Sequence, residues 1–395
     1  MLLDSCTFFD SDPAIAAGKL VDRIKSHGAN PDMLLIFSSY PRAGETIRSA
    51  IVAQLPGITL LGVSSELGVC SSDPATFADI PCMSAMIFFD PEGAYGIASG
   101  TFGSNDQQEL SDHIDLALKR AGRRGEIPDL VFFVFGQVLR QQLIISSFES
   151  LFGRSVPIFG GGAGICGSTM GCFTHKAAYV DEDFYALVLM YPSCQVRTSY
   201  TSFFRTMPYY GVISSTEGNR ILQIDNRSAL DVYTGWLANS YPRDFLDGQE
   251  NMLQEVMNVH PLGVQTGLSH LDSNYRTFVI TETTAGGALR TYTHLKPGTR
   301  VHFMAPFDRE TTLQKYRESI ECTKLRRGCS QTYGILTVTC YIIRSMLAGT
   351  DVEFLRNLDF PICGFFSRGE HGQFSNGVNT DSNLMVASVV FCQED

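Results

Sequence analysis

The sequence predicts a mixed α/β fold, made of repeated βαβ units with an added antiparallel meander and divided into two domains. Three observations carry this prediction: a residue spacing that recurs three times, apolar runs without strict alternation around each copy, and one alternating segment in the second half. We expect layered helices and sheets, with the helices outside and the sheets inside.

The recurring spacing joins a small residue, an arginine four positions later, and a glycine twenty-four positions after the small residue. The copies are Ser38, Arg42 and Gly62; Gly136, Arg140 and Gly160; and Cys340, Arg344 and Gly364. Each copy starts on one apolar run and ends on another. Three equal intervals of this kind predict one structural unit that is used repeatedly.

Each unit is expected to run strand, helix, strand and, later, a third strand. The first strands are short apolar runs of the kind that is buried on both faces. The expected helices are 44–55, 142–152 and 341–358, and the expected third strands are 83–89, 184–191 and 384–391. A strand–helix–strand crossover joins parallel strands. The turns after the second strands should therefore border a crevice where a ligand would sit.

The remaining segments complete the domain plan, which is an N-terminal strand and helix in 1–30, a first domain in 31–205 and a second in 206–395. Asp12 and Pro13 have the residue types that start a helix. A charged helix is expected over 106–120. In the second domain we expect an amphipathic helix within 221–237, capped by Asp225 or Asn226, and an antiparallel meander over 277–306.

Composition narrows the class of protein. The 395 residues are 44% hydrophobic and 18% charged, which is typical of a folded globular chain. A net charge of −11 argues against nucleic acid as a partner. No apolar stretch is long enough for a membrane span and the first residues do not resemble a secretory signal, so we expect a cytoplasmic protein. The eleven scattered cysteines are expected to be free and mostly buried thiols.

Several segments together resemble the FIST family, with its FIST-N and FIST-C domains. They are LLGVSSELGV, which contains Glu66, then VPIFGGGAG and NRSALDVYTGWL, and near the end TCYIIR and PICGFFSRGE. The resemblance covers about 31–392. It implies a ligand-binding region at the family's C-terminal motif, matched here by Cys340, Arg344, Gly364, Phe365, Gly369 and Glu370, and Glu66 is a further ligand-binding candidate. The chain departs from the family pattern after Glu370, where His371 and a longer polar stretch follow.

The resemblance implies a small-ligand sensor in signal transduction, whose signalling partner is a histidine kinase or a cyclic-di-GMP enzyme. One subgroup, similar to the nitric-oxide sensor NosP, binds haem, and His175, His371 and Cys172 are the candidate axial ligands here. A small metabolite such as an amino acid is the other ligand class. Arg344 could bind a carboxylate, either that of Glu370 or that of a ligand. The alternative function is a protein-interaction scaffold without a small ligand.

Three other chemistries are disfavoured by the residues. Cys166, Cys172 and His175 offer only three ligands for zinc, and a closed structural site needs four. Gly162–Gly167 fits a dinucleotide-binding pattern, but a polar, turn-rich segment follows where a helix would be required. Cys340 and His371 could form a nucleophile and base only if their turns met, and a thiol in an apolar strand end is usually inert. We therefore expect that the protein is not an enzyme.

Overall fold

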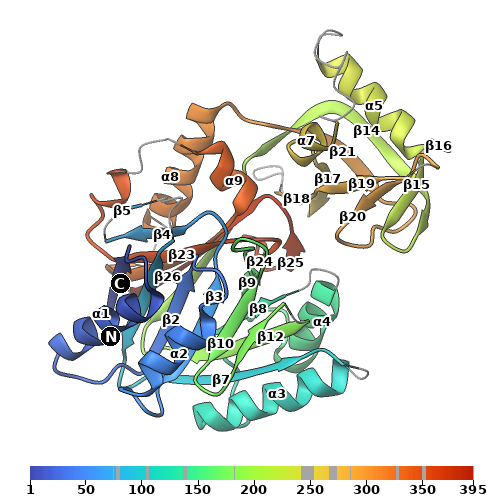
Figure 1. The fold of residues 1–395 in the computed structure, drawn as a ribbon. Coiled ribbons are helices and arrows are strands. Elements are labelled where there is room, and N and C mark those ends of the chain that lie inside the picture. Colours follow the sequence, from blue (N-terminus) through green and yellow to red (C-terminus); the bar gives the residue numbers. More distant parts are fainter. Residues whose placement is uncertain are drawn as a thin grey trace. The chain divides into compact units, whose positions relative to one another are not determined.

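The structure is a computed structural model that describes residues 1–73, 75–76, 81–103, 106–136, 140–181, 183–241, 253–266, 274–284, 286–325, 329–348 and 353–394. The chain forms two compact units. The larger unit contains Met1–Tyr200, Tyr316–Asp381 and Val386–Asp395, and the smaller contains Thr201–Lys315 and Ser382–Met385. The three predicted repeats all lie in the larger unit (Figure 1).

The first repeat follows the predicted order of elements. It consists of β1 (Leu2–Phe8), α1 (Pro13–Ser26), β2 (Met33–Ser38), α2 (Gly44–Val52), β3 (Thr59–Ser64), β4 (Val69–Ser72), β5 (Ala75–Thr76) and β6 (Met83–Phe89). Helix α1 begins as the sequence indicates, because the Asp12 side chain accepts a hydrogen bond from the Ala14 amide at 2.8 Å.

The second and third repeats use the same order. The second consists of β7 (Ala94–Thr101), α3 (Asp106–Ala121), β8 (Leu130–Phe135), α4 (Gln141–Phe152), β9 (Ile158–Gly162), β10 (Gly171–Thr174), β11 (Ala178–Val180) and β12 (Phe184–Tyr191). The third consists of β13 (Gln195–Ser202), β22 (Gln331–Cys340), α9 (Tyr341–Met346), β23 (Ile362–Ser367), β24 (Glu370–Gln373), β25 (Asn379–Ser382) and β26 (Met385–Gln393), with a 3₁₀ turn at Glu353–Leu355.

Each repeat forms the centre of a six-stranded sheet, and the sheets have matching strand orders. The orders are β1-β6-β2-β3-β10-β11, β7-β12-β8-β9-β24-β25 and β13-β26-β22-β23-β4-β5, here named the first, second and third sheets. The predicted crossovers are confirmed, because β2/β3, β8/β9 and β22/β23 are parallel pairs. The third strand of each repeat is antiparallel to the first.

The repeats exchange hairpins in a closed cycle. The β10–β11 hairpin of the second repeat pairs with β3 of the first, β24 of the third pairs with β9 of the second, and the β4–β5 hairpin of the first pairs with β23 of the third. Every sheet is therefore completed by a neighbouring repeat. Without the hairpin of its neighbour, the second strand of each repeat would be an edge strand with unpaired N–H and C=O groups.

The three predicted glycines occupy equivalent places in the cycle. Gly62, Gly160 and Gly364 each lie on the second strand of a repeat, and they pair with Phe173, His371 and Cys70 of the incoming hairpins. In the parallel pairs they lie opposite Ile36, Phe133 and Thr337. Ser38 is two residues beyond Ile36, whereas Gly136 and Cys340 are three beyond their partners. The predicted alignment of the first repeat is therefore wrong by one residue.

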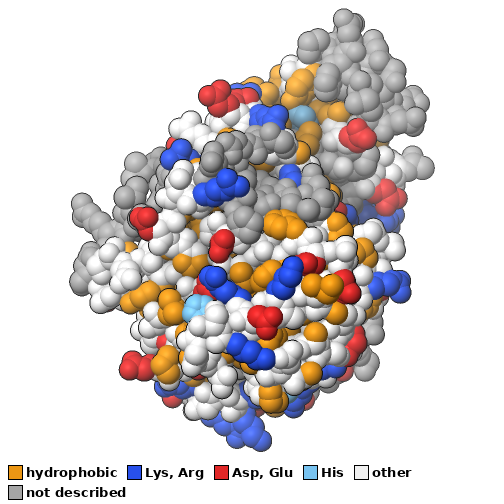
Figure 2. Space-filling view, turned by 60° about the vertical axis from the view of Figure 1, so that its left-hand side comes forward, with side chains coloured by type: hydrophobic (Ala, Val, Ile, Leu, Met, Phe, Trp, Pro, Cys, Tyr) orange, Lys and Arg blue, Asp and Glu red, His pale blue; other side chains and the backbone are white. Residues whose placement is uncertain are grey.

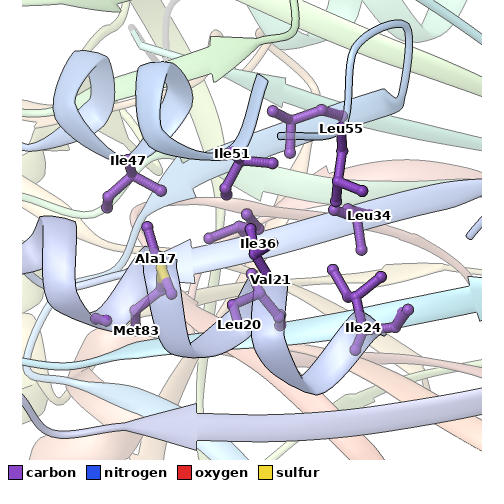
Figure 3. Packing of buried hydrophobic residues seen from close by; sticks show 14 of the residues in the cluster. Ala17, Leu20, Val21, Ile24, Leu34, Ile36, Ile47, Ile51, Leu55 and Met83 are labelled. Atoms are coloured by element: carbon purple, nitrogen blue, oxygen red, sulfur yellow. The ribbon is translucent and has the colours of Figure 1, made fainter. Parts of the chain in front are cut away.

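The helices cover the outer faces of the sheets and the inner faces meet. Apolar side chains of α1 and α2 pack onto β2 and β6, and Ala17, Ile24, Ile36, Ile47 and Met83 belong to this core cluster (Figure 3). Helices α3 and α4 cover the second sheet in the same way. On the inner side, the Phe37 and Phe365 rings stack at 5.3 Å and the Phe88 and Phe391 rings meet at 5.4 Å, which joins the first and third sheets.

The smaller unit is an antiparallel sheet with its own core. Its elements are β14 (Phe204–Glu217), β15 (Arg220–Ile224), β16 (Arg227–Ser228), α5 (Ala229–Ser240), α7 (Leu253–Asn258), β17 (Leu262–Thr266), β18 (Asn274–Phe278), β19 (Ile280–Thr283), β20 (Leu289–Thr291) and β21 (Arg300–Pro306). The strand order is β18-β17-β21-β14-β15-β20-β19. Helix α8 (Arg309–Leu325) leads from this unit back to the larger one.

The structure corrects three predictions of local structure. Helix α9 ends at Met346, well before residue 358. The cap of α5 is Ser228, whose side chain accepts a hydrogen bond from Asp231, while Asp225 and Asn226 have positive φ values in the turn before β16. The segment 277–306 is antiparallel but is not a simple meander, because within it only β19 and β20 pair with each other, and strands from outside the segment separate the rest.

The prediction of free thiols is wrong for one pair. Cys329 and Cys392 form a disulfide with their Cα atoms 5.8 Å apart. The physical reason is tertiary, because β22 and β26 pair side by side and place Thr332 opposite Cys392. Eight other cysteines are free in the described part of the chain, and seven of these are buried, as expected.

Candidate functional site

The turns that follow the second strands interlock at the point where the three repeats meet. The Glu66 amide donates a hydrogen bond to the Phe366 carbonyl at 3.0 Å, and the Gly164 amide donates to the Ser64 carbonyl at 2.8 Å. The Gly162 amide donates to the Gly369 carbonyl at 2.8 Å. The sequence predicts these turns to be close together, but their backbones bond to one another, so no shared hollow separates these bonded groups.

A partly buried ion pair fixes this junction. Arg368 donates to both carboxylate oxygens of Glu66, with Nε–Oε2 at 2.6 Å and Nη2–Oε1 at 2.8 Å. The Glu66 carboxylate also accepts from the Ile165 amide at 3.3 Å, so it joins all three repeats. The Arg368 guanidinium lies over the Tyr341 ring at 4.7 Å. Glu66 thus has a structural partner that the sequence did not indicate, and the two-pronged geometry is the strong form of this contact.

The other residues of the C-terminal motif are buried around the same junction. Cys340 ends β22, and Glu370 begins β24, where its carboxylate accepts a hydrogen bond from Ser367 Oγ at 2.7 Å. Arg344 is 2% exposed and lies over the Phe366 ring at 5.7 Å. Phe365 stacks on Phe37 in the core. These positions give the motif residues packing and bonding roles inside the fold.

His371 lies in the core of the second sheet. It is fully buried, its ring packs beside those of Phe133 and Phe135, and its Nε2 is 3.3 Å from the Phe133 carbonyl oxygen. Nδ1 has no hydrogen-bond partner among the described residues. Burial lowers the pKa of His371 from 6.5 to about 4, and the nearby Asp381 carboxylate opposes this effect only in part.

This burial predicts a loss of stability in acid. Because the unfolded chain takes up a proton on His371 below pH 6.5 and the folded protein does so only near pH 4, the free energy of unfolding should fall as the pH drops between these values. The expected loss is on the order of 3 kcal/mol. Urea unfolding of wild type and His371→Phe across this pH range measures it, with phenylalanine chosen because Phe173 occupies the equivalent place. Parallel pH curves for the two proteins would contradict the prediction.

A cavity lies beside the junction, where β2 ends and α2 begins. It is lined by the β2–α2 connection, the end of β3 and the β10–β11 hairpin with the connection before it, so two repeats contribute to it. We call it the β2–α2 cavity. The volume that the centre of a water molecule can occupy inside it is about 30 Å³. That space holds about two or three water molecules.

The cavity contains one of the predicted site residues and several that the sequence analysis did not select. Cys172, a predicted axial candidate, is buried in its wall, and Ser38, Tyr40, Arg42 and Tyr179 line it. Ser38 and Arg42 both belong to the recurring spacing: Ser38 is the last residue of the buried parallel strand β2, and Arg42 follows it. This position was the signal that could have identified them, since ligands gather at carboxyl ends of such strands.

The described residues do not fit haem. The cavity admits only a few atoms, and the His371 ring is fully buried beside the Phe133 and Phe135 rings. His175 lies outside the cavity lining, and its carbonyl accepts a hydrogen bond from Arg48 at 3.0 Å. No group of three metal-binding side chains occurs in the part of the chain that the structure describes. No helix begins at Gly162–Gly167, where a dinucleotide would need one.

One face of the molecule shows how its charged side chains are distributed. In the view of Figure 2, basic and acidic side chains are interspersed rather than gathered into a field of one sign. Within the described ranges, no helix has both the length and the apolar character needed to cross a membrane.

These features define a class: a three-repeat α/β protein with exchanged hairpins, a separate antiparallel unit and a cavity the size of a small polar group. Family models match nearly all of it, with the FIST N domain on residues 32–227 and the FIST C domain on residues 229–373. The chain therefore belongs to the FIST family, whose domains are associated with sensing small ligands in signalling.

Two solved structures are remotely similar to the chain. The cyanuric acid hydrolase of A. caulinodans aligns over 99% of both chains with 9% identity and a TM-score of 0.36. A second cyanuric acid hydrolase structure covers 78% of this chain and 99% of its own, with 11% identity and a TM-score of 0.28. No curated protein matches the sequence.

Proposed function

We propose that the protein is a cytoplasmic sensor that binds a small metabolite in the β2–α2 cavity and modulates a separate histidine kinase or cyclic-di-GMP enzyme. The family supplies the general role. The observation that supports the site is the lining of the cavity by two repeats, the sheet of the first and the exchanged hairpin of the second. A ligand that contacts both favours the conformation in which the β10–β11 hairpin is paired with β3.

Such a ligand can transmit a signal only if it binds two conformations with different affinities. The hairpin is the candidate element, because β10 pairs with β3 through three residue pairs and its partner β11 is three residues long. The partner enzyme would then bind the part of this protein's surface that changes when the β10–β11 hairpin moves.

A melting experiment with a cavity-filling variant tests the proposal. A panel of amino acids, hydroxy acids and nucleosides is added singly to wild type and to Ala43→Leu, which adds volume at the cavity wall. At least one compound should raise the melting temperature of wild type and have no effect on the variant, since a ligand at a hundredfold excess over its Kd stabilises by about 2.7 kcal/mol. Ala53→Leu, at the exposed C-terminal end of α2, is the matched control.

Two outcomes would favour the alternatives. If no compound shifts the melting temperature of wild type while the protein still binds a kinase or cyclic-di-GMP enzyme, the scaffold function replaces the sensor. If the purified protein shows a Soret band or takes up added haemin, haem and nitric-oxide sensing replace the metabolite. A colourless preparation that takes up no haemin removes that branch.

A further inference from the structure

We propose that the β2–α2 cavity takes a small monocarboxylate, with the carboxylate group held between Ser38, Arg42 and the start of α2. The inference deepens the proposed function and rests on it. It follows from the hydrogen-bonding character of the cavity wall, its size and its charge.

Ser38 contributes a buried hydroxyl with unused donor capacity. It is 5% exposed, and its Oγ accepts a hydrogen bond from the Tyr40 amide at 3.3 Å. Among the described residues, none accepts a hydrogen bond from this hydroxyl. A serine hydroxyl can donate one bond and accept two, and a buried donor without an acceptor is unfavourable. A ligand oxygen in the cavity would supply the missing acceptor.

The start of α2 contributes further donors. Ala43, the residue before the helix, provides no side-chain cap, and both Ala43 and Gly44 line the cavity. The amide groups of a first helical turn carry partial positive charge and bind anions. The one acidic side chain in this turn, Glu45, is turned to Arg48, whose guanidinium donates to both of its oxygens at 2.6 and 2.8 Å. Its charge is therefore balanced along the helix.

Arg42 contributes a full positive charge at the cavity wall. Its guanidinium contacts Asp181 through one 3.4 Å bond, and the two side chains are 70% and 40% exposed. An exposed single contact of this length is weak, whereas a planar guanidinium binds a carboxylate through two parallel hydrogen bonds. A ligand carboxylate could therefore displace Asp181 from Arg42.

Size and charge exclude other ligands. The inner space holds a carboxylate and a short chain but not a nucleotide or a porphyrin. Val63 and Phe173 supply apolar surface for that chain, and the described lining residues include Arg42 but no Asp or Glu, which favours an anion over a cation. The donor-rich wall and the apolar floor together select a small acid over an amine or a neutral polar molecule.

The test compares propionate with propionamide, which has nearly the same shape and no charge. Titration calorimetry on the full chain should show binding of propionate and much weaker binding of propionamide. Arg42→Gln should weaken propionate binding by about tenfold or more, because it removes hydrogen bonds from a charged donor. Asp181→Asn should tighten it severalfold, since the competing charge is lost. Arg154→Gln, at an 86% exposed site away from the cavity, is the control for net charge.

The outcomes separate this inference from the proposed function. Equal binding of propionate and propionamide, or unchanged propionate binding in Arg42→Gln, overturns the carboxylate inference and leaves the sensor standing. The carboxylate inference is also overturned, and the sensor still stands, if wild type binds a neutral panel compound but not propionate and Ala43→Leu abolishes that binding. If nothing binds and Ala43→Leu behaves as wild type with every compound, both proposals fail. A Ser38→Ala variant that weakens propionate binding without altering the melting temperature of the free protein supports the inference.

Discussion

Gly364→Ala is expected to lower the free energy of unfolding by about 4 kcal/mol or more and to reduce the yield of folded protein sharply. A Cβ atom at this position would lie 1.9 Å from the Thr337 carbonyl oxygen and 2.7 Å from Thr337 Cγ2. Thr337 is the register partner of Gly364 on β22, so the clash is with a neighbouring strand and not with a mobile side chain. Relief would require separating β22 from β23.

Urea unfolding measures this effect, and the chain provides a matched control. Gly18 lies inside α1, and a Cβ there would have no atom within 4 Å. Gly18→Ala should therefore stabilise the protein by about 0.5–1 kcal/mol, the usual gain of alanine in a helix. Equal stability of Gly364→Ala and wild type would show that the close approach of the paired strands is not required.

The equivalent glycine of the first repeat extends the argument. A Cβ on Gly62 would lie 2.0 Å from the ring of Phe173, a side chain of the exchanged hairpin. Because the obstacle here is a side chain, Gly62→Ala combined with Phe173→Leu should be less destabilised than the sum of the two single changes. At Gly364 no such compensation is expected, since the obstacle is backbone.

The repeated architecture could be predicted because its signals are local in the sequence. Apolar runs without alternation, such as Met33–Ser38, mark strands buried on both faces, and a βαβ connection fixes its two strands as parallel. The spacing from Cys340 to Gly364 repeats that from Gly136 to Gly160, and the structure places these pairs equivalently. The first repeat is displaced by one residue because its crossover is one residue shorter: Ile36 and Gly62 are 26 positions apart, whereas Phe133 and Gly160, like Thr337 and Gly364, are 27 apart. A fixed interval cannot reveal this difference.

The candidate site could be predicted only in part because its contacts are between repeats. Glu66 and Arg368 are 302 residues apart, and nothing local to either indicates that the β23–β24 turn meets the β3–β4 turn. The sequence interpretation assigned Arg344 and Glu370 to a ligand because of the family motif. The fold buries both side chains, and their ligand role stays a prediction. Exchange of hairpins between repeats decides which turns come together, and turn residues do not encode that choice.

The disulfide was missed for the same reason, and it gives the second large prediction. Cys329 and Cys392 are separated by 63 residues and become neighbours only when β22 pairs with β26. A bond that closes a loop of this length stabilises by about 4 kcal/mol, chiefly by restricting the unfolded chain. Cys329→Ser should therefore lower the free energy of unfolding by about that amount in non-reducing buffer.

Reduction should remove the difference between the two proteins. In dithiothreitol, wild type and Cys329→Ser are expected to unfold at the same urea concentration, because neither then has the crosslink. Cys194→Ser, which removes a partly exposed free thiol, should behave as wild type under both conditions. Thiol titration of the denatured wild type should find two more thiols after reduction than before. The prediction fails if the thiol number is unchanged by reduction, or if Cys329→Ser matches wild type in non-reducing buffer.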